Sequence, residues 1–248
     1  MGQSDRANLP ISPCTRWALS IVPASAPTRG RLDNRGRALV SRLIGLALPY
    51  APQDPALQIE CLQIPDVLCI SPTKHGDERG FFSEVYRHDA LAGYGVDLPF
   101  VQDNHVLSAA RGVLRGLHFQ LAPSAQGKLI RCTKGAILDV AVDIRRGSPT
   151  FGRHVAVELS ADNWRQVWVP PGFAHGYVTL EPDCEVIYKV TSYYDPASER
   201  GLAWDDPALG IDWRMPAGEL TISPKDRTNP ILADLRAAFS YSAGINAD

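Results

Sequence analysis

The chain has 248 residues, 45% of them hydrophobic and 21% charged, and a formal net charge of -2. These values are ordinary for a soluble globular protein with one large all-β domain or two small ones, and they leave no basic excess for binding nucleic acid. No apolar run is long enough to span a membrane. Five scattered cysteines without a C-x-x-C pair argue against a disulfide framework and a zinc site, and they favour the reducing cytoplasm.

The first 56 residues differ in composition from the rest of the chain. They contain seven arginines and three aspartates but neither lysine nor glutamate. Such a composition is also typical of a transit sequence, yet no charged segment precedes a compact apolar core with a cleavage site. We therefore predict a poorly ordered extension or an over-long start over residues 1–56, one domain over residues 57–240, and a tail over residues 241–248.

The domain begins with a turn and a short helix. The segment from Asp77 to Glu84 combines a turn at Gly80 with the start of a strand, and Arg87–Gly93 is predicted to be helical. Arg79 suits a phosphate, because its planar guanidinium matches phosphate oxygens in pairs, but a solvated turn charge is the commoner role of an exposed arginine.

A second polar segment follows an apolar run. Gln102 and Asn104 offer amides that match the donors and acceptors of a nucleobase edge. The intervening Asp103 and the neighbouring Asn104 also form a pair that is common in turns, so this segment is a weak signal taken alone.

The most informative segment runs from Gly112 to Gln120. Arg115 and His118 lie on a short apolar stretch whose glycines allow a ligand to approach the backbone, and Lys128 follows shortly after. A lone histidine on such a strand more often packs in a core than acts as a base. Simple alternation places Arg115 and His118 on opposite faces, so a cavity lined by both requires a bulge or twist near Gly116.

The rest of the domain is predicted to be a series of strands. Between Ile137 and Ile144, four aliphatic residues share one face, and Asp139 and Asp143 lie on the other. Further strands are expected over His154–Leu159, Gln166–Val169, Phe173–Leu180 and Glu185–Thr191. Strands that recur about every 8–12 residues between Gly and Pro turns favour an all-β sandwich or barrel. A second helical segment is predicted over Pro230–Phe239.

Two of these strands carry candidate functional side chains. His175 enters a strand from a Pro-Pro-Gly turn and suits a phosphate or sugar, with a turn histidine as an equal alternative. Tyr188 shares a face with Val186 and Val190, so its hydroxyl is predicted to point into the barrel, where it requires a partner. The six histidines lack the close spacing of a metal site in a barrel, and no phosphate-binding loop or dinucleotide fingerprint is present.

Five ordered stretches between about Ile59 and Leu235 support a more specific interpretation: DERGFFSEVYR, FVQDNHVLSAARGVLRGLHFQ, GKLIRCTKGAILDVAVDIRRGSPTFG, WVPPGFAHGY and VIYKVTSYYDPASERGLAWDDPALGIDW. In this order they resemble the dTDP-4-dehydrorhamnose 3,5-epimerase family. The resemblance implies a cupin-type jelly roll with short flanking helices. It also implies that the protein uses no metal or cofactor and forms a homodimer by exchanging strands near the start of the domain.

The resemblance also assigns roles to individual residues. It implies that His118 is the base, that Asp226 orients it, that Tyr188 is the acid on the opposite face and that Lys128 stabilises the enolate oxygen. Tyr194 matches a position that is usually Phe and stacks on thymine, which a Tyr can also do. Further contacts to the pyrophosphate, nucleotide or sugar are implied for Arg79, Arg115, His175, Glu84, Gln102, Asn104, Glu199 and Lys225.

The function expected from this resemblance is a cofactor-independent 3,5-epimerase that acts on a dTDP-4-keto-6-deoxy sugar. Inversion next to a ketone requires a base, an acid on the other face and stabilisation of the enolate, and the predicted residues provide all three. One alternative is a mono-epimerase of a deoxysugar pathway, which uses the same groups. Another is a non-catalytic cupin that binds a nucleotide sugar.

Overall fold

The structure is a computed structural model that describes residues 56–236 and 239–241. Nearly all of the predicted extension and tail therefore lie outside the described residues. In chain order the longer strands and the helix are β1 (Leu57–Cys61), β2 (Leu68–Pro72), α1 (His88–Ala92), β5 (Gln102–Ser108), β6 (Val113–Gln120), β7 (Lys128–Lys134), β8 (Ala136–Asp143), β10 (His154–Ser160), β11 (Gln166–Val169), β12 (Phe173–Thr179) and β13 (Cys184–Val190). The short strands are β3 (His75–Asp77), β4 (Gly80–Phe82), β9 (Arg145–Arg146), β14 (Glu199–Gly201), β15 (Thr221–Ile222) and β16 (Phe239–Ser240).

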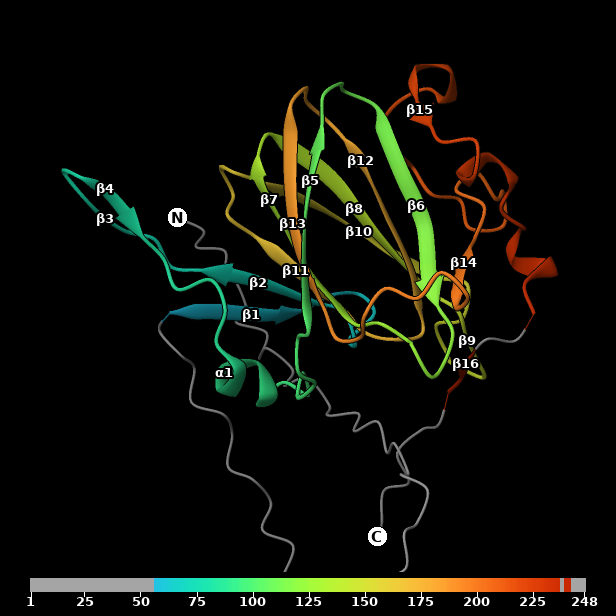
Figure 1. The fold of residues 1–248 in the computed structure, drawn as a ribbon, viewed down its shortest axis with the longest axis horizontal. Helices are drawn as coiled ribbons and strands as arrows, with labels where there is room; N and C mark the ends of the chain where they lie inside the picture. The colour runs from blue at the N-terminus through green and yellow to red at the C-terminus, as the bar shows by residue number, and fades with distance from the viewer. Residues whose placement is uncertain (1–55, 237–238, 242–248) are drawn as a thin grey trace, which may run out of the picture.

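Two antiparallel sheets face each other, which is the jelly-roll arrangement expected from the sequence (Figure 1). The first sheet has the order β1-β2-β11-β7-β13-β5. The second has the order β10-β8-β12-β6-β14, and β15 pairs in parallel with β6. Neighbours in each sheet are mostly distant in sequence, so the chain crosses repeatedly between the sheets and both contribute to one enclosed interior.

The interior has an apolar part and a polar part, and each central strand contributes to both. Successive residues of a strand point to opposite faces, so every second residue faces the space between the sheets. On β12, Phe173 and Tyr177 join the buried apolar cluster there, and His175 lies between them on the same face. On β13, Val186 belongs to this cluster and Tyr188 packs against it, as its alternation with Val186 predicted.

Two further apolar clusters cover the outer faces. The carboxyl-terminal segment packs on the second sheet through Leu202, Leu209 and Trp213. Helix α1 and the segment after it cover the first sheet near β2, β7 and β11, where Leu91 is almost fully buried. In β8 and β12 both faces are buried, and all eight residues of β8 are buried.

The predicted strands from Ile137 onward are confirmed with small shifts of their ends, and α1 lies within the predicted helix over Arg87–Gly93. The predicted helix over Pro230–Phe239 is wrong. Its described part forms a single 3-10 turn over Leu232–Asp234, and Phe239 begins β16. Asp206 accepts a hydrogen bond from the Leu232 backbone at 2.6 Å, which fixes the start of this turn against the body.

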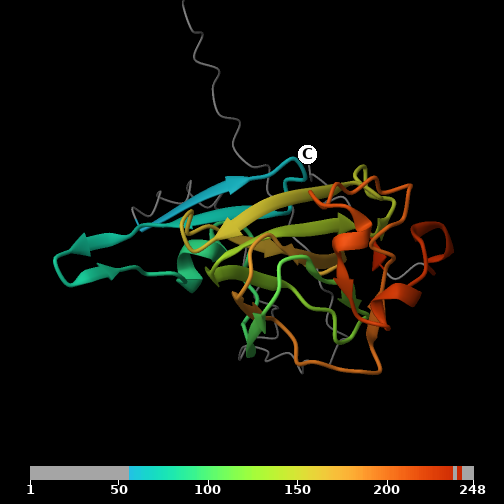
Figure 2. The same cartoon turned by 90° about the horizontal axis from the view of Figure 1, so that it is seen from above.

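The hairpin of β3 and β4 projects away from the two sheets (Figures 1 and 2). Its six strand residues are all exposed, including two large aromatic side chains, Phe81 and Phe82. Seen from above, the hairpin extends from one side of the body and the carboxyl-terminal elements lie on the other. Among the described residues, no helix is long and apolar enough to cross a membrane.

Candidate active site

Strand β6 contains the irregularity that the sequence required. His118 pairs with His175 on β12, and Arg115 pairs with Tyr177, so three steps along β6 match two along β12. The extra residue reverses the alternation, which allows Arg115 and His118 to share the interior face. Gly116 permits the close approach, because a Cβ there would lie 2.6 Å from the Gly176 Cα. The predicted bulge near Gly116 is confirmed.

His118 forms a hydrogen-bonded pair with Asp226. Its Nε2 lies 2.6 Å from Oδ1 of Asp226, which stands at the start of the 3-10 turn Asp226–Thr228. Burial alone would raise the pKa of Asp226, but bonds from His118, the Gly116 amide and Ser223 lower it below its usual value. The carboxylate therefore stays ionised, and it fixes the orientation of the imidazole, whose side chain remains 29% exposed.

A second histidine–aspartate pair lies beside the first. His175 Nε2 is 2.8 Å from Oδ2 of Asp139 on β8, and both side chains are buried. Burial lowers the pKa of His175 more than Asp139 raises it, and the nearby Lys128 and His118 lower it further. His175 is therefore neutral near neutral pH, and its Nε2–H donates to the carboxylate.

Lys128 places a cation next to the same two pairs. Its Nζ donates to the backbone oxygen of His118 at 3.4 Å. Burial lowers the pKa of Lys128 to about 8, against the opposing charges of Asp139 and Glu199. The ammonium is consequently weakly solvated, and a nearby oxyanion would interact with it strongly.

Tyr188 on β13 faces the two histidine–aspartate pairs from the opposite sheet, the sheet that also holds Lys128 on β7. Burial raises the pKa of its phenol, and the charge of Arg115 partly opposes this shift. The phenol is therefore protonated throughout the neutral range and able to donate. Arg115 itself reaches the Ser108 hydroxyl on β5, with Nε donating at 3.3 Å.

A ring of polar groups lies at the edge of this interior. Glu199 accepts hydrogen bonds from the Tyr194 hydroxyl, at 2.8 Å, and from Lys225. Gln102 accepts a bond from the Tyr194 amide at 3.1 Å and donates to Asn104 at 2.9 Å. Tyr194 is thus fixed at its backbone and its hydroxyl, although its ring is half-exposed.

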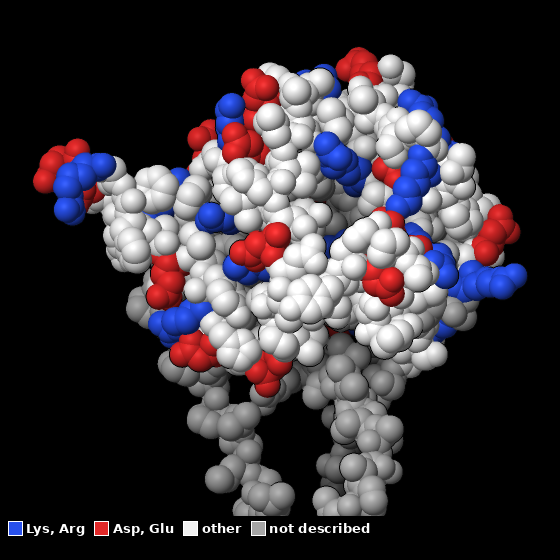
Figure 3. Space-filling view, in the orientation of Figure 1, with Lys and Arg blue, Asp and Glu red and all other residues white. Residues whose placement is uncertain are grey.

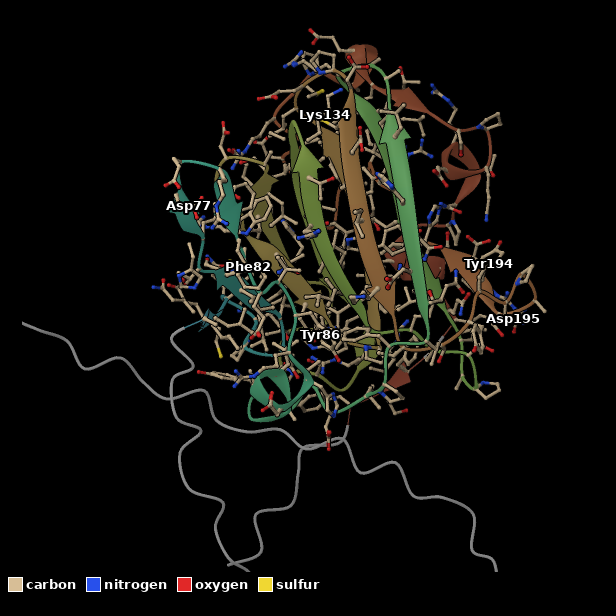
Figure 4. All side chains as sticks on the ribbon, turned by 60° about the vertical axis from the view of Figure 1, so that its left-hand side comes forward. Asp77, Phe82, Tyr86, Lys134, Tyr194 and Asp195 are labelled. Carbon is tan, nitrogen blue, oxygen red and sulfur yellow. The ribbon has the colours of Figure 1, made fainter. Side chains whose placement is uncertain are left out.

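Two of the sequence-predicted residues are not brought to this site within one chain. Arg79 pairs with Asp77 in the projecting hairpin, and its side chain is 82% exposed. Glu84 follows the hairpin in the chain, and its Oε1 lies 3.7 Å from Nη1 of Arg87. Figure 4 shows Asp77 and Phe82 on one side of the strands and Tyr194 on the other.

The face of the molecule in Figure 3 carries no large patch of one charge sign. Lys and Arg are interspersed with Asp and Glu there, and the tip of the hairpin carries both signs. Within residues 56–236 and 239–241, no group of three or more His, Cys, Asp or Glu is arranged to hold a metal ion.

Two interior residues, Asp139 and Tyr177, have no role predicted from the sequence. The alternation of β8 separated Asp139 from its aliphatic neighbours but did not show that both faces of the strand are buried. A carboxylate between the aliphatic residues of a strand was the available signal, because a buried charge requires a partner. Tyr177 gave no signal beyond its position two residues after His175.

The combined geometry suits proton transfer at a carbon acid. A base with an oriented imidazole lies on one sheet, and a buried cation and a protonated phenol lie on the neighbouring strands β7 and β13 of the other sheet. Such an arrangement can remove a proton from one face of a substrate, stabilise the resulting oxyanion and return a proton to the other face.

Comparison with known proteins identifies consistent similarities. A family model described as dTDP-4-dehydrorhamnose 3,5-epimerase matches residues 61–234. A protein of that name from Sinorhizobium fredii is 51% identical over 185 residues, which is 75% of this chain and 94% of the relative. Another from Salmonella typhimurium is 53% identical over 171 residues, which is 68% of this chain and 92% of the relative.

A solved structure shows the same similarity in three dimensions. It is a dTDP-6-deoxy-D-glucose-3,5-epimerase from Legionella pneumophila, crystallised in complex with dTDP-4-keto-L-rhamnose. It is 44% identical, covers 75% of this chain and 100% of that chain, and has a TM-score of 0.72.

Proposed function

Since the chain belongs to the dTDP-4-dehydrorhamnose 3,5-epimerase family, we propose that it inverts C3 and C5 of dTDP-4-dehydro-6-deoxy-D-glucose. The product is dTDP-4-dehydro-L-rhamnose, an intermediate of dTDP-L-rhamnose biosynthesis, and the protein is an isomerase. The observation that supports the mechanism is that His118, hydrogen-bonded to Asp226, and Tyr188 lie on the two sheets that face each other across the same interior.

His118 removes the proton in this mechanism. The ketone at C4 acidifies both neighbouring carbons, so no redox step is needed. Because the His118 Nε2–H donates to the ionised Asp226, the lone pair lies on Nδ1, which takes the proton from carbon. Asp226 then stabilises the imidazolium that forms, since the opposite charge is already in hydrogen-bonding distance.

Lys128 and Tyr188 complete each inversion. The enolate oxygen takes up the charge that leaves the C–H bond, and the weakly solvated ammonium of Lys128 stabilises it. The Tyr188 phenol then gives a proton to the opposite face of the same carbon. A donor at the enolate oxygen contributes roughly 10²–10³-fold and each proton transfer about 10²–10⁴-fold.

The polar ring is the proposed binding site for the nucleotide and sugar. The Tyr194 ring stacks on the thymine, with Gln102, Asn104, Glu199 and Lys225 holding it and contacting the substrate. Arg115 supplies a cation for the pyrophosphate from the wall of the interior. The buried position of His175 favours contact with the sugar over contact with the phosphates.

A homodimer would give a role to the projecting hairpin. We propose that the hairpin of one protomer reaches the site of its partner, and that Arg79 and Glu84 contact the nucleotide there. The exposed Phe81 and Phe82 support this proposal, since two large apolar side chains on a projecting hairpin favour burial against another chain. The cytoplasmic location expected from the sequence stays a prediction.

Turnover in deuterated water tests the proposed reaction. The purified protein is incubated with the dTDP-4-keto sugar, and deuterium is located carbon by carbon. Deuterium at both C3 and C5 with inversion at both supports the proposal. Deuterium at one carbon alone would make the protein a mono-epimerase, and no exchange would favour a nucleotide-sugar-binding cupin.

A mixed-variant assay tests the composite dimer. Arg79→Ala and His118→Ala each inactivate a different part of a composite site. If the parts come from two chains, mixed dimers contain one intact site, and random mixing restores about a quarter of wild-type activity because half of the dimers are mixed. No gain above the two parent variants would show that Arg79 does not complete a partner's site.

A further inference from the structure

Strand β14 pairs with β6, the strand that carries the base. Figure 1 shows β14 beside β6, with the carboxyl-terminal elements on its other side. In the register of the two strands, Gly201 lies opposite His118. The next residue, Leu202, exchanges two backbone hydrogen bonds with Leu117, at 2.9 and 3.4 Å. The backbone of the base is therefore fixed relative to Gly201.

The same segment contacts the chain on both sides of Asp226. Before this aspartate, Lys225 donates a hydrogen bond to Glu199 of β14. After it, the backbone oxygen of Pro230 accepts a hydrogen bond from the Ala203 amide at 2.8 Å. The 3-10 turn that begins at Asp226 is thus connected at both of its ends to the segment that fixes the base.

Asn229 makes a closer contact between this turn and β14. It is the residue that ends the turn, and its side-chain amide occupies the space that a Cβ at position 201 would need. Such a Cβ would overlap Oδ1, Cγ and Nδ2 of Asn229. The Nδ2 atom is buried and has no hydrogen-bond partner among the described residues. The amide is therefore held by packing on the bare Cα of Gly201, a close approach that only glycine permits.

The hydrogen bond between His118 and Asp226 depends on where this turn lies. The carboxylate belongs to a turn of only three residues, and it reaches Nε2 of His118 at 2.6 Å and the Gly116 amide at 3.4 Å. Such a short 3-10 turn has few hydrogen bonds of its own, so its neighbours determine its position. The contacts form a closed path from His118 to Gly201, from there to Asn229, and along the turn back to Asp226.

We propose that Gly201 and Asn229 are positioning residues whose contact sets the distance between His118 and Asp226. This inference rests on the proposed function. Both residues act through Asp226. A side chain at position 201 displaces Asn229 and the turn, so that the imidazole loses its orientation and the charge that stabilises its protonated form. A displacement of about 1 Å can lower the rate by up to about 10²-fold.

Gly201→Ala tests the contact in two backgrounds. In the wild-type protein we expect kcat to fall about tenfold, because the carboxylate moves away from the imidazole. In the Asp226→Asn variant the charge that Gly201 positions is already absent, so the same substitution should change kcat by less than about twofold. Steady-state kinetics of the four proteins measure this coupling. Loss of kcat by the same factor in both backgrounds would overturn the proposal, since Gly201 would then act only in packing.

Asn229→Ala provides a rescue. It removes the three atoms that a Cβ at position 201 would overlap. Alone it should lower kcat about threefold, because the turn loses part of its support. Combined with Gly201→Ala, it should return kcat to within about threefold of wild type, because the added methyl group then has room. A double variant as slow as Gly201→Ala would overturn the proposal.

Gly218→Ala is the matched control. Gly218 is an exposed glycine of the carboxyl-terminal segment, and no atom lies within 4 Å of a Cβ built there, so this variant should keep the kcat and the thermal midpoint of wild type. If Gly201→Ala does not fold, Asn229→Ala decides the question. A loss of kcat in the wild-type background and none beside Asp226→Asn supports the proposal, and equal losses in both backgrounds overturn it.

The outcomes separate this inference from the proposed function. A wild-type protein that inverts no carbon would contradict the function itself. A wild-type protein that inverts both carbons, with a kcat of Gly201→Ala within about twofold of wild type, would overturn only the positioning role of Gly201 and Asn229.

Discussion

Two histidine–aspartate pairs lie side by side in this protein, and they differ in exposure. His118 and His175 are partners in the register of β6 and β12, and each bonds a carboxylate through Nε2. The His118 side chain is 29% exposed, whereas that of His175 is 9% exposed. Asp226 comes from a 3-10 turn late in the chain, and Asp139 comes from the centre of β8.

This difference separates two roles for the same pair of residue types. A base must reach its substrate and carry a positive charge for a short time, which partial exposure permits. A histidine in a buried position keeps a lowered pKa and stays neutral, so it supplies a fixed hydrogen bond instead. A hydrogen-bonded carboxylate therefore does not by itself make a histidine a base.

The largest effect is expected from His118→Ala. The variant removes the base, so turnover should fall about 10³-fold or more, while binding of dTDP should stay close to wild type. Turnover and titration calorimetry measure the two quantities. His105→Ala, which removes an exposed imidazole that bonds Glu185, is the matched control. Turnover above a tenth of wild type in His118→Ala would show that another group is the base.

Tyr188→Phe should come next and should change the kind of exchange. Without the acid, the proton can still leave and return on the His118 face, so we expect deuterium in unchanged substrate and about 10²-fold less inverted product. Mass spectrometry of recovered substrate and product measures both. Inversion at the wild-type rate would exclude Tyr188 as the acid.

The two aspartates provide the most direct contrast between the pairs. Asp226→Asn should lower kcat about 10²-fold, because the imidazolium loses its stabilising charge. Asp139→Asn should lower kcat less. Its main effect should be on the free energy of unfolding, by about 2 kcal/mol, because the buried hydrogen bond of His175 loses its charged acceptor. Kinetics and denaturant titration measure the contrast, and equal kcat losses would contradict the division of roles.

Lys128 gives the smallest effect and a prediction for pH. Its pKa is lowered to about 8, so the ammonium is present below that pH and is lost as the pH rises through it. Turnover should therefore fall above about pH 8. Lys128→Arg keeps a charge at all accessible pH values, so it should be slower by about tenfold but lack this alkaline decline. The same decline in Lys128→Arg would assign it to another group.

The sequence predicted the elements that define the site better than those around it. Alternation located Tyr188 on the inward face. Strict alternation would place Arg115 and His118 on opposite faces of β6. Because both were expected to line one cavity, the sequence predicted an extra residue between them, which is the bulge in the structure. These predictions succeeded because strand periodicity is a local property of the chain.

Other features depended on packing that the local sequence does not encode. The inward direction of Asp139 follows from burial of both faces of β8, which depends on the carboxyl-terminal segment that covers the second sheet. The segment over Leu232–Asp234 forms a 3-10 turn because Asp206, distant in sequence, bonds its backbone. Arg79 lies away from the site because the hairpin of β3 and β4 projects from the body, a direction that the local sequence does not indicate.

A crystal structure of the His118→Asn, Tyr188→Phe double variant with the bound dTDP-4-keto sugar would show whether His118 and Tyr188 act on opposite faces of one substrate. We expect the substituted side chains at positions 118 and 188 to lie on opposite faces of the sugar, each with its nearest side-chain atom within roughly 3–3.5 Å of a reacting carbon, plus about one bond length for the atoms that the substitutions remove. Side chains on the same face of the sugar, or a sugar that contacts only one of them, would contradict it.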